Sequence, residues 1–160
     1  MVEAGRQRNS DAAKGKGVAF QVPKGYVELT PDTAPGEIRF ECQKARMIGG
    51  HYLAPPGHKG GKFGTIQILP DASGEMPAVP TKEKCQAAKV SKRIEKVVGT
   101  LESKGGKTYC LTDQTAAAGR FVSYFGFVRV GEMTWTVLSM SKGESPTLRE
   151  AARGVLLSLK

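Results

Sequence analysis

A long β-hairpin near the carboxyl end constrains the fold of this chain more than any other feature. Residues 119–130 (GRFVSYFGFVRV) and 133–141 (MTWTVLSMS) are rich in the aromatic and β-branched residues that suit a pleated, half-buried surface. Gly131 and Glu132 separate the two runs, and a glycine at the first position of a two-residue connection fits a type II′ turn. Because both faces of these strands are apolar enough to be covered, we expect the hairpin to pack inside an antiparallel sheet.

A C-terminal helix is the natural cover for this hairpin. Ser145 can cap its amino end, and Pro146 fits its first helical position. Its apolar residues recur at helical spacing and form one stripe. They are Leu148, Ala152, Val155, Leu156 and Leu159.

The rest of the chain combines short extended segments with turn residues. The predicted strands cover residues 17–22, 26–29, 38–42, 64–69 and 108–112. A further helix is predicted to begin near Thr81, with an apolar stripe made of Val90, Ile94, Val97, Val98 and Leu101. Residues 1–16 have no apolar period and are expected to form a flexible tail. This order predicts one α+β domain over residues 17–160, an antiparallel β-sheet with helices packed on it.

Residues 49–64 (GGHYLAPPGHKGGKFG) are expected to form a long loop, because six glycines and two prolines fall within sixteen positions. Long loops inside compact domains are often functional or mobile. The side chains of this loop that can make aromatic or charged contacts are the candidate binding residues. They are Tyr52, His58, Lys59, Lys62 and Phe63.

The net charge is +9, from 24 Lys and Arg against 15 Asp and Glu. A polyanion partner would explain this excess, but the basic residues are spread along the chain with acids between them, which favours a role in solubility. No window approaches the run of about 18 apolar residues that spans a bilayer. The first 17 residues lack the apolar core of a secretory signal, and a signal removed from a longer precursor remains open.

Three cysteines leave two interpretations open. In an exported protein we expect a disulfide between Cys85 and Cys110, with Cys42 as an odd buried thiol. In a cytoplasmic protein all three would be reduced thiols packed in the core. No pair has the C-x-x-C spacing of a zinc site, and His51 and His58 do not supply a second half-site, so no metal or cofactor is predicted.

No group of residues in the sequence predicts a catalytic site. Neither histidine lies in a recognised nucleophile motif. Lys62 lacks the spacing of a phosphate-binding loop, since Phe63 follows it and a predicted strand comes next. Residues 124–128 (YFGFV) match only the middle of an RNA-binding sheet motif. A binding protein is therefore favoured over an enzyme.

The two ends of the chain share a pattern with known domains. Residues 18–28 (VAFQVPKGYVE) run from a strand through proline and glycine to an aromatic residue, and the close combines the hairpin with a helix ending VLLSL at 155–159. In both respects the chain resembles PsbP-like and DcrB-like domains over about half its length. The resemblance implies a PsbP-like sandwich, an antiparallel sheet with helices on its faces. It also implies an envelope lipoprotein or exported protein, related to adaptors and chaperones, and it transfers no catalytic residues.

The leading functional hypothesis is a non-enzymatic protein-binding or adaptor domain of the bacterial cell envelope, either lipoprotein-like or exported. Its partner is expected to be another protein, and neither the identity of that protein nor the oligomeric state follows from the sequence. The net charge supports an alternative, a cytoplasmic nucleic-acid or polyanion-binding protein. A small hydrolase that uses His51 and His58 is the second alternative.

Overall fold

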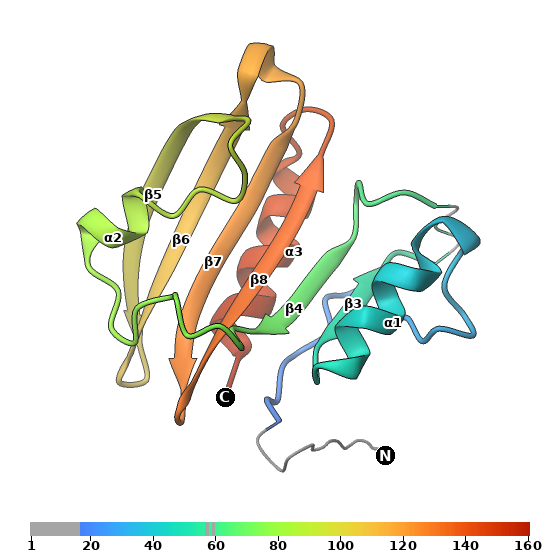
Figure 1. The fold of residues 1–160 in the computed structure, drawn as a ribbon, viewed down its shortest axis with the longest axis horizontal. Helices are drawn as coiled ribbons and strands as arrows, with labels where there is room; N and C mark the ends of the chain where they lie inside the picture. Colours follow the sequence, from blue (N-terminus) through green and yellow to red (C-terminus); the bar gives the residue numbers. More distant parts are fainter. Residues whose placement is uncertain (1–16, 57, 59) are drawn as a thin grey trace.

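One antiparallel sheet of seven strands organises the protein, in the order β2-β3-β4-β8-β7-β6-β5 (Figure 1). This computed structural model describes residues 17–56, 58 and 60–160, so the tail predicted over residues 1–16 lies outside the described residues. The strands are β2 (Val27–Glu28), β3 (His51–Ala54), β4 (Ile66–Pro70), β5 (Ile94–Lys104), β6 (Lys107–Ala116), β7 (Val122–Val130) and β8 (Met133–Ser141). The helices are α1 (Arg39–Met47), α2 (Lys82–Gln86) and α3 (Pro146–Ser158), with 3-10 turns η1 (Gly36–Ile38) and η2 (Ala117–Gly119). The predicted α+β class and antiparallel sheet are therefore confirmed.

Helix α3 covers one face of the sheet and forms the main core with it. Its buried residues Leu148, Val155 and Leu156 pack against side chains from β4, β7 and β8. Gly126 allows a close approach here, because a Cβ on this residue would lie 2.5 Å from the Cys110 carbonyl oxygen and would also meet Leu156. The glycine in the middle of β7 thus lets α3 lie close to the sheet.

Helices α1 and α2 lie on the opposite face, at the two ends of the strand order (Figure 1). On β3, Tyr52 and Ala54 belong to the core beneath α1, whereas Leu53 between them belongs to the α3 core. On β6, Cys110 packs with Cys85 of α2, and Phe127 of β7 joins this cluster. Successive residues of a strand point to opposite faces, so α1 and α2 share the face that α3 leaves.

The strongest sequence predictions are confirmed. The hairpin consists of β7 and β8, and Gly131 has a φ of 64°, in keeping with a type II′ turn. Helix α3 begins as predicted, with Ser145 Oγ accepting a hydrogen bond from the Leu148 amide and Pro146 at the first position. Among the described residues, no helix is long and apolar enough to cross a bilayer.

The helix predicted from Thr81 is wrong beyond its first turns. Thr81 does cap a helix, but α2 ends at Gln86, and residues 94–104 form the edge strand β5. In a regular strand, residues that point to one face are two positions apart. The register shift between Ile94 and Lys96 adds one residue, so the buried residues Ile94 and Val97 are three positions apart, a spacing that is also typical of a helix.

The strand predicted over residues 38–42 is also wrong. Ile38, Cys42 and Ala45 are buried at helical spacing on η1 and α1, whereas Phe40, which completed the apparent alternation, is 66% exposed. Ile38 and Cys42 fit both the two-residue period of a strand and the spacing of a helix. The burial of Ala45 on the same side fits only the helix.

Two further predictions fail near the amino end. The loop predicted over residues 49–64 contains β3, which pairs with both β2 and β4. Residues 17–22 form no strand; Ala19 instead exchanges two hydrogen bonds with Lys160. Both segments owe their conformation to pairing with distant residues, which local composition does not report.

Candidate functional site

The face shared by α1 and α2 has no helix over its centre among the described residues (Figure 1). A row of directly paired residues crosses it from β3 to β5, and each pair in such a row lies on one face of the sheet. The row is Tyr52, Gln67, Leu138, Phe125, Thr112 and Gly99. Tyr52 lies beneath α1, and a Cβ on Gly99 would lie 3.2 Å from the Cys85 sulfur of α2. Leu138 and Phe125 therefore lie on the sheet between the two helices.

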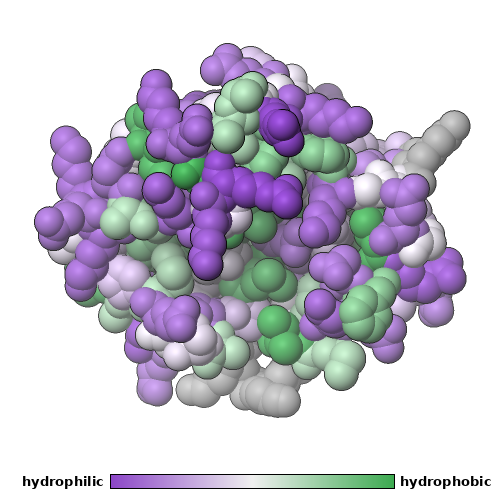
Figure 2. All heavy atoms as spheres, turned by 45° about the horizontal axis from the view of Figure 1, so that its top comes forward, coloured by the Kyte–Doolittle hydropathy of each residue, from purple (hydrophilic) through white to green (hydrophobic). Residues whose placement is uncertain are grey.

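Four apolar side chains form what we call the apolar floor. They are Leu69, Phe125, Leu138 and Met140, and all four are partly exposed. Strand alternation places Leu69, Leu138 and Met140 on the same face of the sheet. Met140 is the next residue of β8 after Leu138 that points to this face. No helix of the described chain lies over this part of the sheet (Figure 1). On this side the molecule is hollowed at its centre, where apolar surface is ringed by hydrophilic side chains (Figure 2).

The connections on either side of α2 form one wall of the floor. Met76 and Ala88 pack with Phe125 against the cluster of Cys85, Cys110 and Phe127. Gln114, which is fully buried, accepts a hydrogen bond from the Val90 amide at 2.9 Å and donates one to the Ala88 carbonyl at 2.5 Å. A buried amide with its hydrogen bonds satisfied fixes this wall against the sheet.

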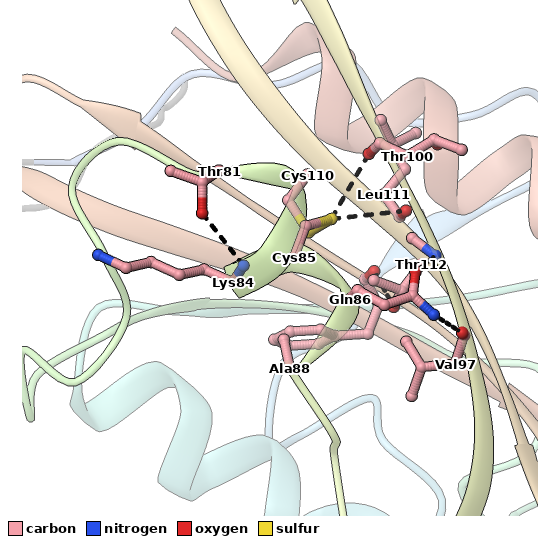
Figure 3. The surroundings of a disulfide bond; sticks show 12 residues. Thr81, Lys84, Cys85, Gln86, Ala88, Val97, Thr100, Cys110, Leu111 and Thr112 are labelled. Carbon is pink, nitrogen blue, oxygen red and sulfur yellow. Dashed lines mark hydrogen bonds between the residues drawn. A yellow bond between two sulfur atoms is a disulfide. The ribbon is translucent and has the colours of Figure 1, made fainter.

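A disulfide attaches α2 to the sheet. The sulfurs of Cys85 and Cys110 are joined, as the sequence predicted for an exported protein, and both residues are fully buried (Figure 3). The Gln86 side chain donates to the Val97 carbonyl and accepts from the Gly99 amide at 2.7 Å. Together these bonds hold the short α2 beside the floor, where a five-residue helix would not be stable alone.

Basic residues lie at the end of the sheet at which β4 and β5 begin, β6 leads into β7 and β8 ends. We call this group the basic rim: Lys62, Lys89, Lys92, Arg93, Arg120 and Lys142. All six are exposed, and none of them takes part in the ion pairs found among the described residues. The Lys142 ammonium lies 5.6 Å from the centre of the Phe63 ring, a cation–π contact at this end.

The candidate residues of segment 49–64 are dispersed. Tyr52 is completely buried beneath α1, and burial raises the pKa of its hydroxyl. His58 is half-buried, with Nε2 3.0 Å from the Gly61 carbonyl oxygen, and Lys59 lies outside the described residues. Lys62 and Phe63 are exposed at the basic rim. Of the four candidates within the described residues, these last two lie beside the apolar floor.

His58 also borders a cavity of about 310 Å³ between β2 and the two proline-containing segments that follow β2 and β3. Its lining includes Val27, Leu29, Pro35 and Pro56. The cavity is open and mostly apolar.

The second histidine belongs to a charged cluster at the edge of the sheet. His51 Nδ1 lies 2.5 Å from Glu28 Oε2, and the same oxygen accepts a hydrogen bond from Arg46 at 3.2 Å. The pairing joins β2, α1 and β3. Cys42 lies inside α1's core, where burial raises the pKa of its thiol. No group of three His, Cys, Asp or Glu with metal-binding geometry occurs within the described ranges.

The floor residues were not among the predicted site residues. Phe125 and Leu138 were assigned to a covered core strand, since both faces of the hairpin are apolar. One signal in the sequence could have indicated the floor. A strand pair that is apolar on both faces needs an apolar layer on each side, and only one long amphipathic helix follows this hairpin. Comparison of the chain with models of known protein families finds no match, and comparison with curated proteins likewise finds no similar sequence.

Proposed function

We propose that this chain is a non-catalytic protein-binding or adaptor domain of the bacterial cell envelope, and that the apolar floor is its binding face. The observation that carries the proposal is the partly exposed group of Leu69, Phe125, Leu138 and Met140, which the described chain leaves without a helix above it. Clustered apolar surface with a polar border is typical of protein interaction sites.

The disulfide supports the envelope assignment. Disulfides persist in oxidising compartments such as the periplasm and are rare in the cytosol. The bond joins Cys85 and Cys110, and the third cysteine, Cys42, is buried and free. A protein with one disulfide and one buried free thiol is consistent with export, which supports this part of the proposal.

A PsbP-like sandwich is the fold assignment that we propose within the α+β class. Its supports are the antiparallel sheet with helices on both faces and the resemblance of residues 18–28 and of the C-terminal hairpin and helix to those domains. Adaptors and chaperones for exported partners occur among the domains that the chain resembles, which agrees with a binding role.

Site-specific photocrosslinking tests the binding face. A benzoylphenylalanine at Leu138 should give one discrete crosslinked protein adduct in the native host, because this side chain lies in the floor. The matched control is Val98, which is 48% exposed and lies on the α3 face, paired with Asp113. Equal adducts at both positions, or adducts at neither, would overturn the proposed binding face.

Counting thiols tests the compartment. Protein from acid-quenched native cells, alkylated in denaturant before any reduction, should carry one label, on Cys42. Three labels would place the chain in a reducing compartment and overturn the envelope assignment.

A further inference from the structure

Resting on the proposed function, we infer that the floor binds an acidic segment of another protein, whose aliphatic side chains cover the floor while its carboxylates face the basic rim. The geometry that points to this partner is the position of the rim relative to the floor. Cations on the border of an apolar site select an oppositely charged partner and speed its association.

The β4–β8 side of the rim is attached directly to the floor. The Gly64 amide donates a hydrogen bond of 2.9 Å to the carbonyl of Met140, a floor residue. The Thr65 hydroxyl donates one of 2.7 Å to the Lys62 carbonyl, which holds Lys62 and Phe63 at the end of these strands. Lys142 follows β8 two residues after Met140, and its ammonium lies over the Phe63 ring.

The β6–β7 side of the rim is held by the buried Gln114. Its hydrogen bonds to the backbone of Ala88 and Val90 hold Lys89, which lies between them, beside Gln114. Gln114 pairs with Ser123, and Ser123 pairs with the floor residue Met140. The backbones of Arg93 and Arg120 are both bonded to Ala117 at neighbouring strand ends. The Ala117 amide donates to the Arg93 carbonyl at 3.1 Å, and the Arg120 amide donates to the Ala117 carbonyl at 3.2 Å.

The charge at this end is clearly positive. Glu95 is two residues from Arg93, Glu144 is two residues from Lys142, and Glu37 lies against Gly60, so these three acids beside six rim cations leave an excess of three positive charges. Glu37 lies against the backbone of Gly60: a Cβ added to Gly60 would be 2.9 Å from the carboxyl carbon of Glu37. None of the rim cations is in an ion pair among the described residues, so pairing with carboxylates of a partner would break no ion pair of this part of the chain.

The composition of the floor favours a protein over a nucleic acid. Single-stranded nucleic acids bind through aromatic side chains on which bases stack. Three of the four floor residues, Leu69, Leu138 and Met140, are aliphatic or thioether side chains, which offer contacts for Leu, Ile, Val or Met of a peptide. A polar phosphate backbone would gain nothing from them.

The test is selection from a random 12-residue peptide library displayed on phage, with the oxidised full chain immobilised. We expect enriched peptides that combine Asp or Glu with aliphatic residues. The most enriched peptide is then synthesised with a fluorescent label, and its binding is measured by anisotropy. Two rim and floor variants are compared with wild type: K62E/K89E/K142E, and Leu138→Ser. The matched control is K24E/K104E/K160E, which reverses three exposed lysines outside the rim.

The expected result is a loss of affinity of at least tenfold in both the rim and floor variants, and less than twofold in the control. Circular dichroism and thermal unfolding establish that each variant is folded, and Met140→Ser replaces Leu138→Ser if the latter is not. A labelled 20-nucleotide oligo-dT measured in parallel should bind more weakly than the peptide. Rim-dependent binding of oligo-dT that exceeds peptide binding would overturn the inference in favour of a nucleic acid.

Failure of the inference differs from failure of the proposed function. Enriched peptides that are neutral or basic, and whose binding still depends on Leu138, would overturn the acidic partner and leave protein binding by the floor intact. Selection of no peptide whose binding depends on Leu138 or Met140 would overturn both.

Discussion

Ala19 and Lys160 exchange two backbone hydrogen bonds of 3.0 Å each, so that the first described segment of the chain lies along its last residue. The Gln21 amide adds a hydrogen bond of 2.8 Å to Ser158 Oγ in α3. Val18 and Phe20 pack against the α3 core from the same segment. Residues 18–21 therefore stabilise the C-terminal helix, although they form no strand of the sheet.

Replacing Phe20 by alanine should destabilise the protein by about 1–3 kcal/mol, less than the loss for a fully buried phenylalanine. Phe20 is partly buried, and its ring lies 4.7 Å from the His51 ring. Urea unfolding measures the change in the free energy of unfolding. Val22→Ala is the control, since Val22 is 39% exposed, and its effect should stay within about 0.5 kcal/mol. Equal losses in both variants would show that residue 20 makes no specific contact.

Removing the disulfide with C85A/C110A should cost roughly 3–4 kcal/mol, because the bond closes a loop with a sequence separation of 25 in the unfolded chain. Urea unfolding with and without reductant measures this. Reductant should destabilise wild type and leave the double variant unchanged. Cys42→Ala, in which the disulfide stays intact, should keep its sensitivity to reductant. Wild-type protein that is insensitive to reduction after full unfolding and refolding would contradict the prediction.

Gln86→Ala should expose the edge of β5. The Gln86 side chain occupies the positions of a neighbouring strand, bonding both the Val97 carbonyl and the Gly99 amide. Unprotected edges recruit further strands. We expect a loss of about 1–2 kcal/mol and concentration-dependent association in sedimentation velocity. Gln43→Ala, on the exposed surface of α1, should remain like wild type in both measurements. A Gln86 variant with unchanged stability and no association would refute the capping role.

Two glycines near α3 should respond to alanine in opposite directions. Gly126→Ala should destabilise by about 2–4 kcal/mol, because the new methyl group would overlap the Cys110 carbonyl oxygen and Leu156. Gly154→Ala should stabilise by about 0.5–1 kcal/mol, since the new Cβ would meet nothing within 4 Å beyond its chain neighbours and the nearby backbone of α3, and alanine favours the helix. Thermal unfolding distinguishes them. A tolerated alanine at position 126 would mean that α3 does not lie close to β7.

Stability should fall at alkaline pH. Burial raises the pKa of Tyr26, Tyr52 and Tyr109 in the folded protein. The neutral phenols favour folding, so this stability is complete below the unfolded-state value of about 10 and is lost as the pH rises through the higher folded-state pKa. Urea unfolding between pH 8 and 11 should show the decline, and Tyr52→Phe should make it shallower. An unchanged slope in Tyr52→Phe would show that this hydroxyl does not titrate differently on folding.

The local signals in the sequence account for the last part of the chain, from the β7–β8 hairpin to α3. The turn at Gly131, the cap at Ser145 and the alternation of the hairpin act over a few residues, and each appears in the structure where it was predicted. Segments whose conformation depends on distant pairing were misassigned. β3 forms because β2 and β4 flank it, and β5 carries a register shift that only its pairing with β6 reveals.

By itself, the sequence determined the α+β class, the antiparallel hairpin and its covering helix, whereas it left the Cys85–Cys110 disulfide and three reduced thiols as alternatives. Only the tertiary structure decided which apolar residues remain uncovered. Phe125 and Tyr124 are adjacent and similar in the sequence, yet Tyr124 is buried in the α3 core and Phe125 is partly exposed on the floor. The reason is physical: the alternation of a strand divides its residues between two faces, but the cover on each face comes from elements far away in the chain.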